Sequence, residues 1–425
     1  MVAGSLLWGC KAPSLTRDVR PQKANAYTWI LDPGAPGADV PPAGKSLFDE
    51  LVNGRPAYPF ARLVADIERQ TGARFDRVLI PLGRSLQRSS GGPDFFRYPR
   101  AVVALDSEPA KSFRLPVKDR LYMGFQERAS VIEVISYNDQ AGRFEFQVVT
   151  NYQAGSKPSV TYANRFICTH CHQNQAPLFP RQLWDETNAN PRISRLLKTH
   201  ANQFHGVPSE QDADVPYRID KAVHRSNDMS VYQNVWRFGL SRNANDAASV
   251  RMRAAWLECM LRYRISGSRS YDDSSAPFLQ NFKSPLVESL KLRFPAGMAV
   301  PNPEIPNRNP LALLSREVSM DDANTQAFLS VRQRQIDAQF EPANPRRPLE
   351  LWNPNDPALI DRLVIGGSSL FSQTDIRRLA GVADSLNFRI QNLTDETISG
   401  KSGWLSAPAL RPHAICERLM AMSLN

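Results

Sequence analysis

The chain has 425 residues, of which 42% are hydrophobic and 22% are charged, and its formal net charge is +10. This length predicts two or three domains, and the apolar content is high enough for a core, which excludes a wholly disordered chain. No run of about 18 apolar residues occurs, so we expect no transmembrane helix. The basic residues are scattered and match no nucleic-acid-binding motif, so we expect no nucleic-acid partner. They favour either a solvated basic surface or docking to an acidic protein.

The first ten residues end in Leu7-Trp8-Gly9-Cys10, which resembles the cleavage box of bacterial lipoproteins, where the cysteine becomes the lipidated N-terminus. The stretch before it lacks a basic region, so residues 1–10 are interpreted as a truncated signal, or as no signal at all. Residues 11–60 are rich in proline, glycine and alanine and predict a tether or an extended arm. A lipid on Cys10 would make this segment a membrane tether.

Residues 61–165 predict an antiparallel sheet module. Helical periodicity comes first, as a short turn at 47–51 and an amphipathic helix at 58–71. The period then changes to two, which is typical of strands with one buried face. A glycine-containing turn at 138–142 separates two alternating segments and predicts a hairpin. The expected strands are 78–80, 101–105, 121–125, 130–137, 143–150 and 159–162.

The most specific motif follows this region, at Cys168-Thr169-His170-Cys171-His172. The pattern Cys-x-x-Cys-His is the attachment signature of haem c. Two thiols one helical turn apart form thioethers with the two vinyl groups, and the following histidine donates the proximal nitrogen to iron. On these residues the chain resembles the c-type cytochromes, and the resemblance is confined to the motif. It implies one covalently bound haem c, held by Cys168, Cys171 and His172.

Two other chemistries use the same residue types. Zinc takes cysteine and histidine ligands, but such sites usually draw a second ligand pair from elsewhere, and no second Cys-x-x-Cys or His-x-x-x-His pair occurs. A redox-active dithiol normally lies between a strand and a helix in a βαβ unit, which the proline-containing segment after His172 does not resemble.

Residues 166–425 predict a mainly helical, proline-rich module. The fold class is therefore α+β, with an N-terminal antiparallel sheet module followed by a cytochrome c-like helical module. Ser372-Gln373-Thr374-Asp375 is typical of a capping box that opens a helix. The expected helices are 191–204, 230–240, 246–265, 276–292, 372–382 and 412–422.

The sixth ligand of the iron decides between electron transfer and catalysis. Met298, in a Pro/Gly-containing loop, is the first candidate for the distal ligand, and each methionine could equally be a core residue. Met229 and Met260 are weaker candidates because both occupy helical positions. Distal histidine candidates, each also readable as an ordinary histidine, are His200, His205, His224 and His413.

Two cysteines, Cys259 and Cys416, remain once the motif and Cys10 are assigned. In an oxidising compartment they could form a disulfide. Two buried thiols on separate helices are the alternative, because the sequence does not fix their distance.

These observations predict an exported monohaem c-type cytochrome, periplasmic or attached to a bacterial membrane as a lipoprotein. We expect one-electron transfer with a protein redox partner. One alternative is a haem enzyme of peroxidase or oxygenase type with an open sixth iron position, for which His205 and Glu210 are acid–base candidates. A dihaem peroxidase is disfavoured because the chain has one motif. The other alternative is a non-catalytic haem-containing subunit of a membrane-surface complex.

Overall fold

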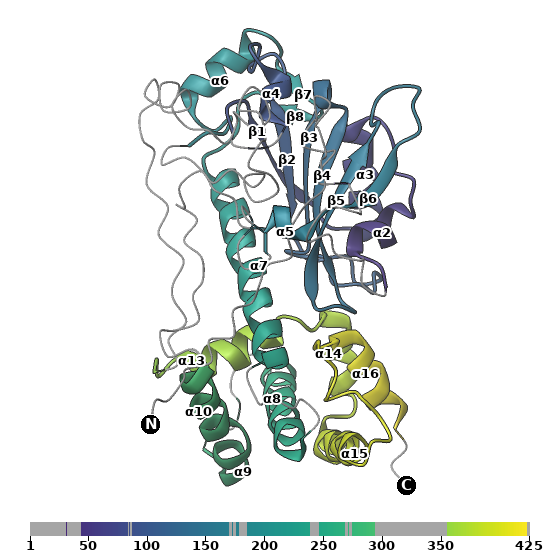
Figure 1. Cartoon of the computed structure of the whole chain (residues 1–425), viewed down its shortest axis with the longest axis vertical. Helices are drawn as coiled ribbons and strands as arrows, with labels where there is room; N and C mark the ends of the chain where they lie inside the picture. The colour runs from purple at the N-terminus through teal and green to yellow at the C-terminus, as the bar shows by residue number, and fades with distance from the viewer. Residues whose placement is uncertain are drawn as a thin grey trace, which may run out of the picture.

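The computed structural model describes most of the chain (Figure 1). The described residues are 31, 44–83, 85, 87–169, 172, 176–177, 185–238, 246–267, 271, 274–293 and 355–422. Within them a six-stranded antiparallel sheet precedes a series of helices. The chain is therefore a mixed α+β protein, as its sequence predicts.

The sheet is a simple meander in which each strand pairs with the next one in the chain. Alternating apolar residues predict all six strands, and the β4–β5 hairpin closes at the expected turn with Asn138 opposite Arg143. The strands are β1 (Phe75–Ile80), β2 (Arg100–Leu105), β3 (Leu121–Gln126), β4 (Val131–Asn138), β5 (Arg143–Thr150) and β6 (Ser159–Tyr162).

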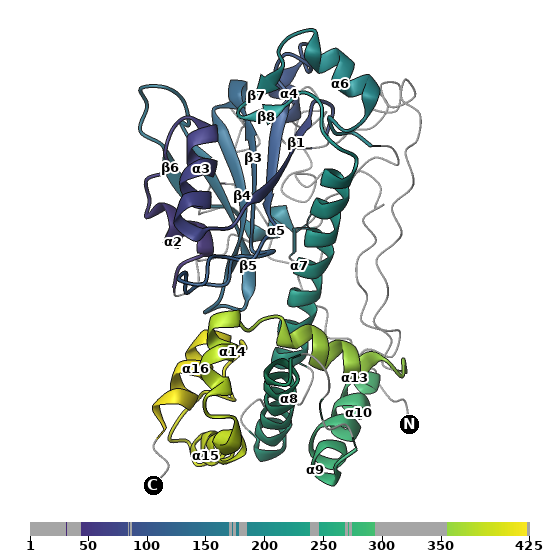
Figure 2. The same ribbon diagram turned by 180° about the vertical axis from the view of Figure 1, so that it is seen from behind.

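One face of the sheet is covered by α2 (Leu47–Val52) and α3 (Phe60–Thr71), which lie in front of the strands in Figure 2. A capping box formed by Ser46 and Asp49 starts α2. The N–H of Phe48 donates to Ser136 Oγ on β4 at 2.8 Å. Residues 47–52 therefore form a helix that packs on the sheet, although the sequence assigns them to the tether. Their buried apolar side chains outweigh the local proline and glycine content.

The other face is crossed by the long helix α7 (Asp214–Phe238) (Figures 1 and 2). The sequence predicts this helix only from residue 230, because its first half is rich in charged and polar residues. Several of these face the sheet. Tyr122 and Ser226 share a hydrogen bond of 2.7 Å, and Arg218 pairs with Asp76 at 2.7 Å. Pro216 is accommodated in the first turn, where its missing N–H costs no helical bond.

The remaining helices gather beyond one end of the sheet, below it in Figure 1, around α8 (Ala247–Ile265). The predicted helices 246–265, 276–292, 372–382 and 412–422 are confirmed within about two residues at each end. The predicted helix 191–204 ends at Lys198. The sequence analysis does not predict α15 (Leu386–Ile398). The elements are α9 (Ala276–Phe278), a π-helical turn (Leu279–Lys283), α10 (Ser284–Arg293), α13 (Leu359–Asp361), a π-helical turn (Arg362–Gly366), α14 (Gln373–Ala380), a 3₁₀ turn (Ala383–Ser385), α15 (Leu386–Ile398) and α16 (Pro412–Ala421).

Short elements complete the sheet end of the molecule. They are α4 (Arg88–Gly91), a 3₁₀ turn (Glu127–Ala129), α5 (Arg165–Cys168), α6 (Pro191–Lys198) and the small hairpin of β7 (Gln203–Phe204) and β8 (Val207–Pro208). Of these, α5 lies between the sheet and α7 in both views (Figures 1 and 2). It carries the first cysteine of the haem-type motif.

Candidate functional site

The motif begins where the sheet ends. β6 stops at Tyr162 and α5 starts at Arg165. The N–H of Cys168 donates to the carbonyl of Asn164 at 3.2 Å, and the N–H of His172 donates to the carbonyl of Cys168 at 2.9 Å. Both are helical bonds from residue i to residue i−4, so Cys168 and His172 lie about one helical turn apart on the same side of the backbone.

A buried ion pair anchors the first residue of α5 to the sheet. Arg165 Nη1 donates to the carbonyl of Phe144 at 2.6 Å and to Glu145 Oε2 at 3.0 Å. The side chains of Arg165 and Glu145 are only 7% and 1% exposed. Arg143 Nε donates to the other oxygen of Glu145 at 2.9 Å. Two guanidinium groups thus satisfy one buried carboxylate, and this fixes the start of the motif helix on β5.

An aromatic contact positions the histidine of the motif. The imidazole ring of His172 lies 5.3 Å from the ring of Phe146, centroid to centroid, with 32° between the ring planes. Phe146 is a buried residue of β5, and the guanidinium carbon of Arg165 lies over the Phe146 ring, 5.8 Å from its centroid. The same strand therefore orients both Arg165 and His172.

The thiol of the motif borders an apolar region. Cys168 is half-buried and packs against the large core cluster between the sheet and α7. Cysteine behaves there as a small apolar side chain with access to both the core and the surface. Cys171 and His170 lie outside the described residues, as do Met298 and Cys10.

The described histidine candidates for the distal position are spread over the molecule. His205 contacts the ring of Phe125 at 4.8 Å, and Phe125 belongs to the cluster on the α3 face, opposite that of Phe146. Burial lowers the pKa of His205. The sheet thus separates His205 from His172. His200 lies just after Thr199, the C-cap of α6, and His224 lies on α7.

The methionine candidates on helices are core residues. Met229 of α7 is 4% exposed and Met260 of α8 is fully buried. A Cβ placed on Gly367 would come within 2.8 Å of the Met260 sulfur, so Met260 packs directly against that glycine backbone. Both positions match the core-residue alternative.

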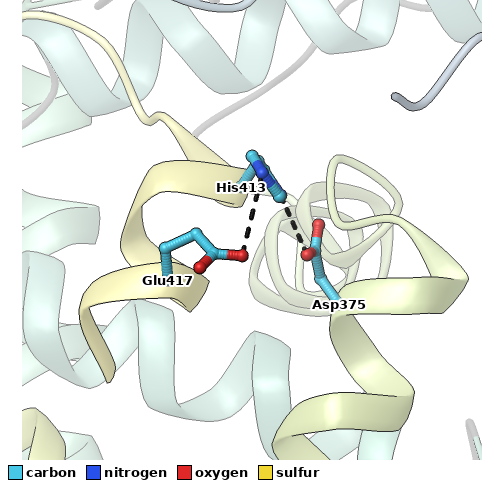
Figure 3. A group of neighbouring side chains, drawn as sticks. All are labelled: Asp375, His413 and Glu417. Atoms are coloured by element: carbon cyan, nitrogen blue, oxygen red, sulfur yellow. Dashed lines mark hydrogen bonds and ion pairs between the residues drawn. The ribbon is translucent and has the colours of Figure 1, made fainter. Parts of the chain in front are cut away.

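His413 belongs to a polar group that joins α14 to α16 (Figure 3). Its Nδ1 lies 3.0 Å from Oδ1 of the buried Asp375, and its Nε2 lies 3.9 Å from Glu417 Oε1. Asp375 also accepts from Ser372 Oγ, and Glu417 pairs with Arg378. In the described part of the chain this is the one group of three His, Cys, Asp or Glu residues close enough to share a metal ion, and it excludes Cys168 and His172. Its three side chains already have hydrogen-bond or ion-pair partners within the protein, so the group links α14 to α16.

Cys259 and Cys416 lie buried on α8 and α16, and no disulfide joins them. The structure places the two cysteines as buried thiols on separate helices. Both α14 and α15 pack against each of these two helices. Burial raises the pKa of the Cys416 thiol well above its ordinary value, so this thiol stays protonated and unreactive at neutral pH.

A pair of carboxylates shares one guanidinium beside α7. Arg225 holds Asp119 through two hydrogen bonds of 2.7 and 2.8 Å and also bonds Asp106. Burial, opposed by Arg225 and reinforced by Asp119, raises the pKa of Asp106 to about 7. Between about pH 4 and pH 7 folded Asp106 holds a proton that the unfolded chain has released. Its contribution to the free energy of unfolding therefore falls as the pH rises through this range.

We expect Asp106→Asn to remove this pH dependence. We compare the free energy of unfolding of the variant with that of the wild type at pH 5 and at pH 8. The difference should shift in favour of the variant by about 1–2 kcal/mol from pH 5 to pH 8, because the amide avoids the ionisation that the wild type undergoes. Urea unfolding at the two pH values measures the change. A difference between variant and wild type that is the same at both values contradicts the expectation.

Phe146, Arg165 and Glu145 were not singled out by the sequence analysis. One signal was available: Glu145 lies between two buried aromatic residues of a strand, where a charge needs a partner. Arg165 lies three residues before Cys168, but its partner is twenty residues away in sequence. That contact depends on the sheet register and is invisible to local spacing.

Comparisons with protein-family models, with curated proteins and with solved structures found no match to this chain. Among the helices that the structure describes, none combines the length and the apolar character needed to cross a membrane.

Proposed function

We propose that the chain is an exported monohaem c-type cytochrome that transfers single electrons to or from a protein partner. The observation that carries the proposal is the Cys-x-x-Cys-His spacing in the sequence. Of its described members, Cys168 is half-buried beside an apolar cluster, and His172 lies one helical turn further on, against Phe146. Thiol, thiol and imidazole are the donor set of haem c. Cys168 and His172, the two described members of the set, provide one thiol and the imidazole.

Each residue has a specific task in this proposal. Cys168 and Cys171 would hold a porphyrin covalently, and His172 would be the proximal ligand. Phe146 limits the rotation of the imidazole, and Arg165, bonded to Glu145, keeps the first turn in place. A bound haem supplies a reversible one-electron couple, whose potential rises with burial in an apolar environment.

The surface charge supports a protein partner. The chain carries a formal net charge of +10. Opposite charge on a partner raises the association rate by steering the encounter, as is useful for transient electron-transfer complexes. We therefore propose an acidic redox protein as partner, with export, and a lipid on Cys10, placing the chain in the periplasm or at a membrane surface.

The absorption spectrum of the purified protein tests electron transfer against an oxygen- or peroxide-using enzyme. We expect the reduced protein to be low-spin and unchanged by carbon monoxide, because in this proposal Met298 would fill the sixth iron position. Met298→Ala should then allow carbon monoxide to bind. Met229→Ala is the matched control, since Met229 is a core residue on α7, and it should not.

Ready binding of carbon monoxide by the wild type would instead favour a haem enzyme with an open sixth position. A filled position combined with very slow reduction would favour the non-catalytic subunit. The three functions thus give different combinations of two measured properties.

A further inference from the structure

A separate cavity lies where the sheet, α7, α8 and the start of α14 meet. Its volume is about 480 Å³, and none of its lining residues belongs to the haem-type motif. The walls come from the loop between β2 and β3, from α7 and α8, and from the segment that leads into α14. Such a size suits a small organic molecule.

The lining of the cavity is strongly basic. Six basic and two acidic side chains line it, a net formal charge of +4. Both acidic groups already face cations: Asp119 is held by Arg225, and Glu108 lies 3.8 Å from Lys118. Within the described part of the chain, Arg120, Arg264 and Arg377 have no carboxylate oxygen within 4.0 Å. The cavity therefore holds an excess of positive charge.

Arg120 provides an independent observation that points to a ligand. It is 4% exposed, and its Nε has no hydrogen-bond partner among the described residues, although Nη2 donates to the carbonyl of Leu370 at 3.1 Å. A buried guanidinium N–H without an acceptor is costly, so an acceptor from outside the chain would be favourable here. The nearby acid Asp139 does not supply it, since its Oδ1 is likewise buried without a partner.

Two further features match an anion. Arg264 lines the cavity, and burial lowers its pKa, so a bound negative charge would offset the cost of keeping it charged. Ser372, Gln373 and Thr374 also line the cavity and form the N-terminal end of α14. The helix dipole at that end favours negative charge.

The walls are also partly apolar. Phe113, Phe371 and Met229 line the same space. We propose that this cavity binds an organic anion, whose carboxylate or phosphate oxygens accept from Arg120 and Arg264 and whose apolar part lies against Phe113 and Phe371. The planar guanidinium groups suit either oxyanion.

Calorimetric titration of the full chain with phenyl phosphate, benzoate and inorganic phosphate tests the proposal. We expect one equivalent of an aromatic anion to bind, at least about tenfold more tightly than inorganic phosphate, because the ring buries apolar surface. Whether phenyl phosphate or benzoate binds more tightly identifies the anionic group. The measurement does not depend on haem, so its result is independent of the proposed electron transfer.

Variants locate the binding. Arg264→Gln should weaken the affinity by about tenfold or more through loss of a charged donor. Arg262→Gln is the matched control on the same helix, since Arg262 pairs with Glu258 and does not line this cavity, and it should bind as the wild type does. Arg120→Lys keeps the charge but removes the Nε–H and should also bind more weakly. No saturable binding of any probe, or binding unchanged in Arg264→Gln, overturns the proposal.

Discussion

Replacing Cys168 and Cys171 together by alanine is expected to abolish covalent haem attachment, with no haem remaining on the polypeptide after denaturation. Each single variant should retain at most one thioether, because each thiol forms one bond. Mass spectrometry of the denatured variants, produced in cells that assemble haem c, measures the loss. The double variant should also unfold at a lower temperature than the loaded wild type, since the ligand stabilises the folded state.

Cys416→Ala is the matched control for this experiment. Cys416 is a fully buried thiol on α16, outside the motif, and its replacement removes packing while leaving attachment intact. Loss of haem in the control to the same extent as in the double variant would mean that attachment fails through misfolding. Retention of haem by the double variant would contradict the assignment of these two cysteines.

Arg165→Met is expected to lower the free energy of unfolding by about 2–4 kcal/mol, since it leaves the buried Glu145 with one guanidinium partner in place of two. The half-buried Arg143 limits the cost. Denaturant unfolding monitored by circular dichroism measures the change. The double variant Arg165→Met/Glu145→Met should lose less than the sum of the two single variants, because both members of the more deeply buried pair are then removed and only the half-buried Arg143 loses its partner.

Arg218→Met provides the comparison for the buried pair. Arg218 pairs with Asp76 at 2.7 Å, but its side chain is 47% exposed. We expect a cost below about 1 kcal/mol, because water and salt screen an exposed pair. Equal costs for Arg165→Met and Arg218→Met would contradict the role given to burial at the motif.

The sheet could be predicted from the sequence because its strands pair with their neighbours in the chain. Local alternation and one turn fix the β4–β5 hairpin, where Ile135 lies opposite Phe146. The first half of α7 could not be predicted in the same way. Its charged residues pair with parts of the sheet module more than 100 positions away, as Arg218 does with Asp76 of β1. Judged by the hydrophobicity of their neighbours in the sequence, such residues are predicted to be solvent-exposed.

The site shows the same division. The spacing of Cys168, Cys171 and His172 is local and is visible in the sequence. The contacts that hold His172 and Arg165 come from β5 and depend on tertiary structure. The basic cavity is still harder to predict from local sequence, since Arg120, Arg264 and Thr374 come together only when the sheet and the C-terminal helices pack. The sequence shows the positive charge but not its concentration in one place.

The most direct test of the central claim is the intact mass of the denatured wild-type protein, purified from cells that assemble haem c. Covalent haem attachment predicts the mass of the polypeptide plus one haem, with the modified peptide containing Cys168 and Cys171. A polypeptide that carries no haem under these conditions would rule out a c-type cytochrome.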